Sequence, residues 1–399
     1  MDNHLSLDIL QQAASQIGLN LLACTEDLDA TEDLNHLKQW QEKGFNGEMS
    51  YMDKSAALMT KVSSIFPEAK TLISFAVHYS YKKREVLKPE HGFVARYAWG
   101  LDYHMFLSKR LTRLVDLLEN QLGFKIKYKS YTDSVPLLER VFAHKAGLGF
   151  IGKNTMLIQK GIGSYFLLCQ LVVNFKIKKT AFKILSQIPE TNFQAECGTC
   201  RTCIDTCPTK AFSEPRILDA RKCISYLTIE KKRILSEWER KAVGSWVFGC
   251  DECQSCCPFN HKSKKQNREH QIEEFSEVNG VGQQLSLKSL LEIHSNKAFE
   301  RRFKNTPLLR PRRSGLTRNA LCVAVNTNSE ALIDLIHARA LNDKSETIRS
   351  HAVWAFTKLA NLSNDQFNPR TIKLLNHSLK DRSEIVRAEA SSLLEIPYL

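Results

Sequence analysis

Residues 197–208 read CGTCRTCIDTCP, with four cysteines and a closing Cys-Pro pair. A second segment, residues 249–260, reads GCDECQSCCPFN and also closes its cysteines with Cys-Pro. Cys223 lies between the two segments, so nine of the chain's twelve cysteines fall within residues 197–258. Cysteines with this density and spacing predict a metal or cluster site around which the chain is organised.

The spacing of the first segment is C-x2-C-x2-C-x3-C-P, which is typical of the bacterial ferredoxins that bind [4Fe–4S] clusters. In two-cluster ferredoxins the cysteine before the proline ligates the other cluster. This rule assigns eight ligands to two clusters and leaves Cys256 unassigned. The first cluster is predicted to be bound by Cys197, Cys200, Cys203 and Cys257, and the second by Cys207, Cys223, Cys250 and Cys253.

Zinc sites and disulfides are the alternative readings of these cysteines. Zinc also uses C-x2-C pairs, but three cysteines at this spacing followed by x3-Cys-Pro fit a tetrahedral site poorly. Disulfides need an oxidising compartment, whereas the N-terminus, MDNHLSLDILQQAASQ, does not have the pattern of a signal peptide. No apolar run approaches about 18 residues, so no membrane span is predicted. We therefore expect a soluble, cytoplasmic iron–sulfur protein.

The 399-residue chain has a net charge of +13, which favours a polyanionic partner. Basic residues gather in three groups around the cysteine segments. They are Lys231, Lys232, Arg233, Arg240 and Lys241; Lys262, Lys264, Lys265 and Arg268; and Lys297, Arg301, Arg302, Lys304, Arg310, Arg312, Arg313 and Arg318. Such runs are often only solvated surfaces, but three of them beside a redox centre favour a substrate that carries phosphates.

The segment 1–190 mixes helical and strand patterns, which predicts one α+β or α/β domain. Apolar spacing predicts helices over residues 4–18, 31–43 and 103–122, the last with Asp102 as its N-cap. A further helix is expected from Pro136 to Ala146. Strand-forming runs occupy residues 19–24, 71–78, 124–131, 156–158 and 165–175.

The C-terminal segment 315–399 contains an internal repeat. LNDKSETIRSHA (341–352) and LKDRSEIVRAEA (379–390) share Leu, Asp, Ser, Glu, Arg and Ala in register. A repeat of about 40 residues with amphipathic helices is typical of HEAT-like α-solenoids. Such a surface usually binds a large partner, and a purely structural cap is the alternative. The predicted domains are therefore residues 1–190, a cluster domain over 191–262, a basic helical linker over 263–314, and HEAT-like repeats over 315–399.

Residues 131–163 read YTDSVPLLERVFAHKAGLGFIGKNTMLIQKGIG and form the densest block of polar and glycine residues. Arg140 and His144 are spaced to share one helix face. The glycines that follow could let backbone amides approach a ligand. A phosphate-binding P-loop is not predicted, because Asn154 rather than Ser or Thr follows Lys153. Asp133 precedes a proline turn, so it is either a turn residue or a proton donor.

Five segments together resemble the epoxyqueuosine reductase family. They are RYAWGLDYH (96–104), TDSVPLLERVFAHKAGLGFIGKN (132–154), CGTCRTCIDTCPTKA (197–211), CISYLTIE (223–230) and GCDECQSCCPFN (249–260). The resemblance covers nearly the whole chain. It implies an α+β fold in which an N-terminal α/β cobalamin-binding domain precedes a ferredoxin-like domain with two [4Fe–4S] clusters and C-terminal HEAT-like repeats.

The resemblance also implies the reaction, the reduction of epoxyqueuosine to queuosine at the wobble position of tRNAs with GUN anticodons. Asp133 matches the family's general acid, and the eight cluster cysteines match one for one. Donation of a proton near neutral pH would require a poorly solvated Asp133 with a raised pKa. The cobalamin contacts expected on this basis are Arg96, Tyr97, Asp133, Arg140, Lys153, Asn154 and Ser225. The expected tRNA contacts are Lys231, Lys232, Arg233, Arg301, Arg302, Arg312 and Arg313.

Three departures from the family pattern stand out: Phe150 replaces a common Trp, Cys256 a common apolar residue, and Met59 an expected Arg. An external electron donor and a monomeric chain are expected. Two other functions remain open at this point. One is a related cobalamin and iron–sulfur reductase of a small molecule, similar to reductive dehalogenases. The other is an electron carrier without enzymatic activity.

Overall fold

The computed structural model describes residues 4–53, 56–79, 82–178, 194–262, 272–361 and 368–395. The chain packs into two compact units, each of which is built from separate segments. Unit 1 comprises residues 1–82, 101–221 and 251–279, and unit 2 comprises residues 83–100, 222–250 and 280–399. The division therefore does not follow the consecutive domains expected from the sequence, because the cysteine-rich region contributes to both units.

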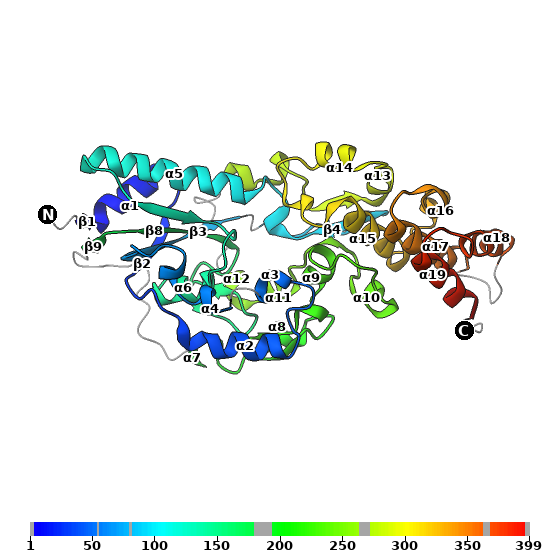
Figure 1. Ribbon diagram of the computed structural model, residues 1–399, viewed down its shortest axis with the longest axis horizontal. Coiled ribbons are helices and arrows are strands. Elements are labelled where there is room, and N and C mark those ends of the chain that lie inside the picture. Colours follow the sequence, from blue (N-terminus) through cyan, green and yellow to red (C-terminus); the bar gives the residue numbers. More distant parts are fainter. Residues whose placement is uncertain are drawn as a thin grey trace. The chain divides into compact units, whose positions relative to one another are not determined.

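Unit 1 is organised around an antiparallel four-stranded sheet with the strand order β2-β3-β8-β5. These strands are β2 (Leu21–Thr25), β3 (Thr71–His78), β8 (Phe166–Val173) and β5 (Tyr128–Tyr131). Helices α1 (Leu7–Ser15) and α5 (Tyr103–Leu122) lie on one face, and α6 (Glu139–Lys145) lies on the other (Figure 1). Every residue of β3 is buried, as expected for a strand covered on both faces.

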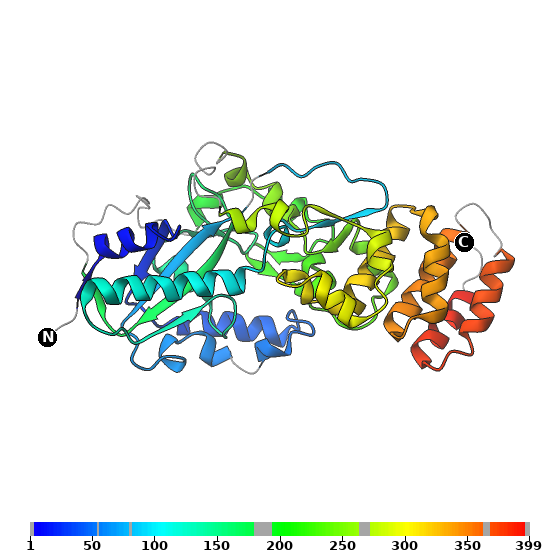
Figure 2. The ribbon, with the colours of Figure 1, turned by 90° about the horizontal axis from the view of Figure 1, so that it is seen from above.

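Helix α5 has the bounds predicted from the sequence, and in Figure 2 it runs along the sheet of unit 1. The Asp102 side chain accepts the His104 N–H at 3.0 Å and so caps the first turn. At the other end, Gly123 has φ of +74°, the left-handed conformation that glycine adopts without steric cost. The cap at Asp102 fixes the position of Tyr103 and His104, which belong to the candidate site.

The other elements of unit 1 are short. They are β1 (His4–Ser6) with β9 (Lys176–Lys178), η1 (Thr31–Asp33), α2 (Leu34–Glu42), α3 (Ser50–Asp53), α4 (Ala56–Met59), η2 (Val62–Ser64), the hairpin β6 (Phe150–Ile151) and β7 (Leu157–Ile158), α7 (Gln194–Cys197), α8 (Thr202–Asp205), the hairpin β10 (Phe212–Glu214) and β11 (Ile217–Leu218), α11 (Glu252–Ser255), α12 (Pro258–Lys262), η6 (Glu273–Phe275) and η7 (Glu277–Asn279). Helices α8 and α11 each follow the first cysteines of a segment and pack against each other.

Unit 2 begins with a three-stranded sheet that the sequence did not predict. Its order is β12-β4-β13, with β4 parallel to β12 and antiparallel to β13. The strands are β4 (His91–Val94), β12 (Trp246–Phe248) and β13 (Gln284–Ser286). The short helical elements of this unit are η3 (Arg96–Ala98), α9 (Ile224–Ile229), α10 (Glu237–Ala242), α13 (Leu287–Leu291), α14 (Asn296–Arg302), η8 (Pro307–Leu309) and η9 (Glu330–Leu332), and η4 (Ala220–Lys222) spans the chain boundary between the units.

Five longer helices complete unit 2. They are α15 (Arg312–Asn326), α16 (Ile333–Asn342), α17 (Glu346–Ala360), α18 (Pro369–Ser378) and α19 (Glu384–Glu395). Helix α17 packs against α15, α16 and α19, and it is buried over most of its length. Nowhere in the described part of the chain does a helix have the length and apolar character needed to cross a membrane.

The internal sequence repeat is also a repeat of contacts. Asp343 accepts the Ser345 N–H at 2.9 Å, and Arg349 Nη1 donates to the Asp343 carbonyl at 2.8 Å. The second copy has the same pair of bonds: Asp381 accepts the Ser383 N–H at 2.8 Å, and Arg387 Nη1 donates to the Asp381 carbonyl at 2.7 Å. The matching residues therefore build the same turn before α17 and before α19.

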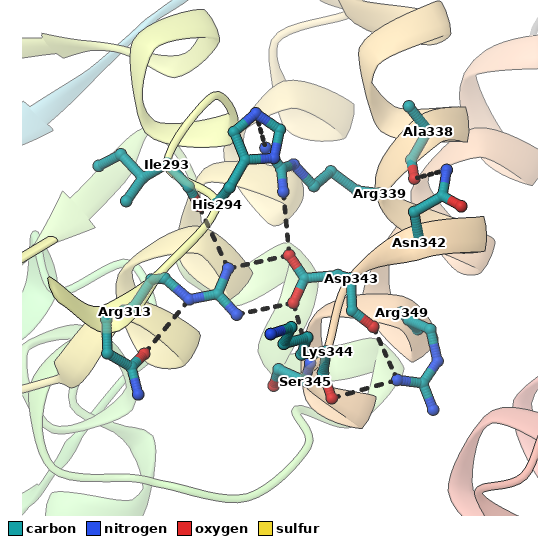
Figure 3. Close-up of polar contacts among 11 residues, drawn as sticks. Ile293, His294, Arg313, Ala338, Arg339, Asn342, Asp343, Lys344, Ser345 and Arg349 are labelled. Atoms are coloured by element: carbon teal, nitrogen blue, oxygen red, sulfur yellow. Dashed lines mark hydrogen bonds and ion pairs between the residues drawn. The ribbon is translucent and has the colours of Figure 1, made fainter. Parts of the chain in front are cut away.

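The Asp343 carboxylate also accepts hydrogen bonds from two arginines, as Figure 3 shows. Arg313 donates to its two carboxylate oxygens at 2.7 and 2.9 Å, and Arg339 donates at 3.1 Å. Burial favours a raised pKa for Asp343, but the bonds from Arg313 and Ser345 and the two guanidinium charges hold the pKa below its usual value. Arg313 was expected to contact tRNA, and this expectation is corrected: the side chain is 5% exposed and is bound to Asp343.

Candidate functional site

Asp133 lies just after β5 in a left-handed conformation, with φ of +51°. Its N–H donates to Glu139 Oε1 at 2.8 Å, and its carboxylate accepts the Tyr103 hydroxyl at 3.1 Å. Outside glycine this conformation is uncommon, and Asp tolerates it better than most residues. The side chain is 71% exposed, so the protein's own side chains do not enclose it as the sequence interpretation expected. The turn thus presents the carboxylate outward.

His104 lies between two carboxylates. Its Nδ1 is 2.7 Å from Asp102 Oδ1, and its Nε2 is 3.9 Å from Asp133 Oδ2. Burial favours a lower pKa for His104, but the bond to Asp102 and the charges of Asp102, Asp133 and Glu139 raise the pKa above its usual value. The ring also stacks on Tyr103, with centroids 4.0 Å apart. Sequence reasoning treated Asp102 only as a helix cap, although the Asp-Tyr-His order placed a proton acceptor beside a histidine.

Glu139 is the other carboxylate next to Asp133, and sequence reasoning did not single it out. It starts α6, and burial together with the Asp133 charge raises its pKa to about 7. The N–H of Asp133 opposes this shift in pKa by donating to the carboxylate. Glu139 therefore anchors the backbone of the Asp133 turn and remains partly protonated near neutral pH.

Two hydroxyl groups immediately before Asp133 are buried without a hydrogen-bond partner among the described residues. They are the Tyr131 phenol and the Thr132 hydroxyl. Burial raises the pKa of Tyr131 to about 12. Buried polar groups normally find partners, so these orphaned hydroxyls point to a polar ligand beside the turn.

Lys153 and Asn154, two of the expected cobalamin contacts, are bound to the cysteine segments. Lys153 Nζ donates to the carbonyls of Gly198 and Cys200 at 2.6 and 2.9 Å. Asn154 Nδ2 donates to the Cys253 carbonyl at 3.1 Å. These bonds connect the glycine-rich block of the sequence to both cysteine segments within unit 1.

The other expected contact from this block, Arg140, donates to the Thr155 carbonyl at 2.6 Å. Two of the glycines serve packing within the β6–β7 region. A Cβ atom at Gly149 would lie 2.5 Å from the Ile158 carbonyl oxygen, and one at Gly152 would lie 2.5 Å from Ile158 Cδ1. Gly149 and Gly152 thus let the backbone pass close to Ile158.

The cysteines predicted for the first cluster all lie in unit 1. Cys197 and Cys257 pack in an apolar group with Phe150, Ile158 and Phe259. Burial raises the pKa of Cys203 to about 12, with further contributions from the nearby thiols of Cys256, Cys257, Cys197 and Cys200. The unassigned Cys256 therefore lies among the predicted ligands.

None of the twelve cysteines forms a disulfide in the structure. Among the described residues no three metal-binding side chains converge on one point as the ligands of a single ion would. A cubane cluster makes a different demand, because each of its four irons takes one thiolate.

The cysteines predicted for the second cluster are divided between the units. Cys207 and Cys253 belong to unit 1, and Cys223 and Cys250 belong to unit 2. Within unit 2, Cys223 precedes α9, and Cys250 follows β12 and packs in the apolar group of Ala95, Ile224 and Trp246. Cys223 and Cys250 are thus held in place by α9 and by the small sheet of unit 2.

The remaining expected cobalamin contacts also belong to unit 2. Arg96 is 6% exposed, and its guanidinium lies 5.5 Å from the Trp99 ring. Tyr97 packs near Phe248, with ring centroids 6.1 Å apart. Ser225 is partly buried in α9. Each is held by packing inside its own unit.

Several basic residues expected to contact tRNA have partners within unit 2. Lys231 pairs with Glu239 at 2.6 Å, and Arg302 donates to the Ser289 carbonyl at 2.7 Å. Lys232 Nζ donates to the Ile229 and Arg310 carbonyls at 2.7 and 3.0 Å. Of the expected contacts, Arg233, Arg301 and Arg312 lie exposed on the unit, as do Lys232 and Arg302. Lys264, Lys265 and Arg268 lie outside the described residues.

The chain resembles known proteins both in sequence and in structure. Residues 196–260 match the family model of a 4Fe-4S double cluster binding domain, and residues 60–134 match the model "Epoxyqueuosine reductase QueG, DUF1730". The chain is 34% identical to the epoxyqueuosine reductase of Pseudomonas aeruginosa, over 83% of this chain and 89% of that relative. It belongs to the epoxyqueuosine reductase family. It is also 35% identical to the Escherichia coli epoxyqueuosine reductase, over 66% of this chain and 69% of that relative.

Two solved structures of epoxyqueuosine reductases resemble the chain over 98% of both chains. One, at 26% identity and a TM-score of 0.83, is bound to an epoxyqueuosine-modified tRNA-Tyr stem loop. The other, from Bacillus subtilis, at 25% identity and a TM-score of 0.83, has its aspartate-bearing catalytic loop swung out of the active site. The chain is therefore an oxidoreductase of this family, and all eight predicted cluster ligands fall within its double-cluster domain.

Proposed function

We propose that this protein removes the epoxide oxygen of epoxyqueuosine at the wobble position of tRNAs with GUN anticodons, which yields queuosine. The observation that carries the substrate assignment is the likeness, over 98% of both chains, to an epoxyqueuosine reductase bound to a modified tRNA stem loop. Loss of an epoxide oxygen as water breaks two C–O bonds and consumes two electrons and two protons. The protein must therefore supply two electrons for the cleavage of the C–O bonds and two protons to the departing oxygen atom.

The electrons enter from an external donor through two [4Fe–4S] clusters. The first is bound by Cys197, Cys200, Cys203 and Cys257, and the second by Cys207, Cys223, Cys250 and Cys253. The family match over residues 196–260 supports two clusters, and the packing of Cys197 with Cys257 supports the crossed assignment of the first. Because each cluster passes one electron at a time, the two together match the two-electron demand of the reaction.

Cobalamin is the proposed partner of the clusters. Its corrin ring carries amide side chains, and the orphaned Tyr131 and Thr132 hydroxyls beside Asp133 suit an amide-bearing ligand. Bound and reduced, cobalamin would supply a strong nucleophile or low-valent reductant. Asp133 lies next to those hydroxyls, and the other residues proposed to hold the cofactor are Arg96, Tyr97, Arg140, Lys153, Asn154 and Ser225. Corrin absorption bands in anaerobically purified protein would test this assignment, and a protein with clusters but no corrin bands would contradict it.

Asp133 is the proposed general acid. Its carboxylate projects from a turn and accepts a hydrogen bond from the Tyr103 hydroxyl. This bond orients the carboxylate, and its exposure lets it reach a substrate oxygen. The B. subtilis relative, whose catalytic loop also bears an aspartate, supports this role by likeness. Proton donation by a positioned acid typically accelerates a reaction by about 10²–10⁴.

The tRNA is proposed to bind through exposed basic residues of unit 2, among them Arg233, Arg301 and Arg312. The repeated helical turns at Asp343 and Asp381 support a short HEAT-like solenoid in the same unit. A modified base must leave its stack to reach a site inside a protein. Phosphate contacts then hold the backbone while the base is extruded.

Nucleoside analysis of tRNA tests the proposed function directly. Cells that lack this protein should accumulate epoxyqueuosine, and a plasmid copy of the gene should restore queuosine. Unchanged queuosine in the deleted strain would overturn the proposal.

A further inference from the structure

The proposed reaction needs two protons at the same oxygen atom, and this inference rests on that proposed function. The first proton converts the epoxide oxygen to a hydroxyl, and the second lets that hydroxyl leave as water. A single carboxyl group carries one proton. Asp133 must therefore be reprotonated, or joined by another acid, before a turnover is complete.

A chain of three titratable side chains lies at this place in unit 1. Asp102 Oδ1 is 2.7 Å from His104 Nδ1, and His104 Nε2 is 3.9 Å from Asp133 Oδ2. A carboxylate only accepts hydrogen bonds, so Nδ1 carries a proton toward Asp102. The opposite ring nitrogen, Nε2, faces the proposed acid.

The ring of His104 is held in this orientation from two sides. Asp102 accepts both the ring Nδ1–H and the His104 backbone N–H, the latter at 3.0 Å. Tyr103 stacks on the ring at 4.0 Å and also donates its hydroxyl to Asp133 at 3.1 Å. Tyr103 and His104, the two residues after the helix cap, thus both face the Asp133 carboxylate, and α5 positions both.

We propose that the Asp102–His104 pair returns a proton to Asp133 and so provides the second proton of the deoxygenation. After Asp133 has protonated the epoxide oxygen, the His104 imidazolium transfers its Nε2 proton to Asp133 Oδ2. Asp133 then protonates the hydroxyl, and the second C–O bond breaks with release of water. The electron pair comes from the reduced redox centres, and His104 regains its proton from solvent through a side chain that is 40% exposed.

The distance of 3.9 Å between His104 Nε2 and Asp133 Oδ2 is longer than a hydrogen bond, but catalytic contacts often tighten only in the substrate complex. Asp133 is on a turn and exposed, so rotation of its carboxyl group or one bridging water can close the gap. The groups that face His104 are Asp102, Asp133, Glu139 and Tyr103. Their three carboxylates favour the protonated ring, which the transfer requires.

Glu139 is the rival proton source, since it also lies against Asp133. Its Oε1 accepts the Asp133 backbone N–H, however, and no bond from Glu139 to the Asp133 carboxylate is seen in the described region. We therefore assign Glu139 to positioning of the turn and His104 to proton supply.

The test is single-turnover conversion of epoxyqueuosine tRNA by prereduced holoenzyme across a range of pH. The His104→Gln variant should turn over about tenfold more slowly, a smaller loss than the usual ~10²–10⁴ of acid catalysis, because solvent can still reprotonate Asp133. The wild-type rate should fall with rising pH as His104 loses its proton, and the pH–rate profile of the variant should lack this fall. Added imidazole should restore part of the variant's rate. The matched control is His36→Gln, since His36 is an exposed histidine of α2 outside the site.

Equal rates and pH profiles for wild type and His104→Gln would overturn the relay while the proposed function stood. Failure of the wild type to convert the tRNA would instead overturn the proposed function. If His104→Gln does not fold, Asp102→Asn provides the second measurement, because asparagine still caps the helix. That variant should move the inflection to lower pH, and an unmoved inflection would contradict the relay.

Discussion

The Gly249 N–H donates to the Thr228 hydroxyl at 2.9 Å, and this bond joins the residue before Cys250 to the helix that begins after Cys223. Asn319 of α15 strengthens the junction, since its Nδ2 donates to the carbonyls of Thr228 and Val247 at 2.8 and 2.9 Å. Its neighbour Arg318 is fully buried and donates to the Leu227, Lys231 and Arg233 carbonyls. The first long C-terminal helix thus fixes two of the proposed cluster ligands of unit 2.

The Asn319→Ala variant should weaken this junction, because two buried carbonyls lose their donor. Each unsatisfied group costs about 1–3 kcal/mol. We expect a lower unfolding free energy and a loss of iron toward four atoms per chain in holoprotein, with the first cluster retained. Iron analysis and EPR of the reduced protein measure this loss. Asn342→Ala is the control at an exposed amide, and a full iron complement in Asn319→Ala would contradict the assignment.

The Asp343→Asn variant should destabilise unit 2, because it leaves Arg313 and Arg339 buried without a carboxylate. Removal of one partner of a buried pair typically costs about 3–5 kcal/mol. Urea unfolding measures the loss. The control is Asp334→Asn, whose carboxylate is 80% exposed and pairs with Arg370, and this change should cost less than about 1 kcal/mol. Similar costs for the two variants would show that the buried pair has no special weight.

The Asp343 carboxylate also leads to a prediction about stability at low pH. The pKa of Asp343 is lowered from the ordinary 3.8, so its contribution to stability is present above that pH and is lost as the pH falls through the folded-state value. The stability difference between wild type and Asp343→Asn should therefore narrow below pH 3.8. A constant difference across the acid range would contradict this linkage.

The Asp133→Asn variant should keep both clusters and its fold but lose about 10²–10⁴ in turnover rate, because the amide cannot donate the required proton. Single-turnover conversion by prereduced enzyme measures the chemical step apart from electron delivery. Iron content and thermal unfolding serve as controls for folding. Near-wild-type conversion would exclude Asp133 as the general acid.

For Glu139 we predict a change of stability with pH that is opposite in sign to that for Asp343. Its pKa is raised from 4.5 to about 7, so the protonated form is favoured in the folded state and stability is lost as the pH rises through that window. Glu139→Gln keeps an oxygen to accept the Asp133 N–H but cannot ionise. Its unfolding free energy, relative to wild type, should rise between pH 4.5 and about 7. Glu139→Ala should slow turnover by freeing the Asp133 turn, and unchanged turnover would contradict a positioning role.

Arg301 provides a test of the phosphate contacts. Arg301→Ala should weaken tRNA binding and reduce the slope of log affinity against log salt by about one. Binding measured at several salt concentrations gives this slope. Arg302→Ala is the matched control on the same helix, because Arg302 is already bound to Ser289. Equal changes in slope for the two variants would contradict the distinction.

Much of unit 1 could be predicted because its signals are local. Asp102 and Gly123 mark the ends of α5, and the run of β3 is long and apolar. The strands of unit 2 could not be predicted in this way. Strand β13 is a short polar segment that pairs with β4, which lies far earlier in the chain, so nothing nearby in sequence marks it.

The site was predicted unevenly for the same physical reason. The cysteine spacing and Asp133 could be identified from segments of sequence. Glu139 was missed because its role depends on a turn that folds back onto α6. Arg318 belonged to a basic run that predicted surface charge, yet its guanidinium is buried by the backbone carbonyls it binds. Charge in a sequence does not distinguish a phosphate contact from a cap on a buried chain segment.

The neighbourhood of Cys203 and Cys257 has a consequence for synthesis of the protein. The two residues are 54 positions apart (257 minus 203), so at roughly 5–20 residues per second a ribosome needs about 3–11 s to make the second after the first. During that interval Cys197, Cys200 and Cys203 emerge as a set of thiols without their fourth member. If Cys257 is the fourth ligand, as proposed, the first cluster can be completed only after the later segment has left the ribosome, and the early thiols must stay reduced until then.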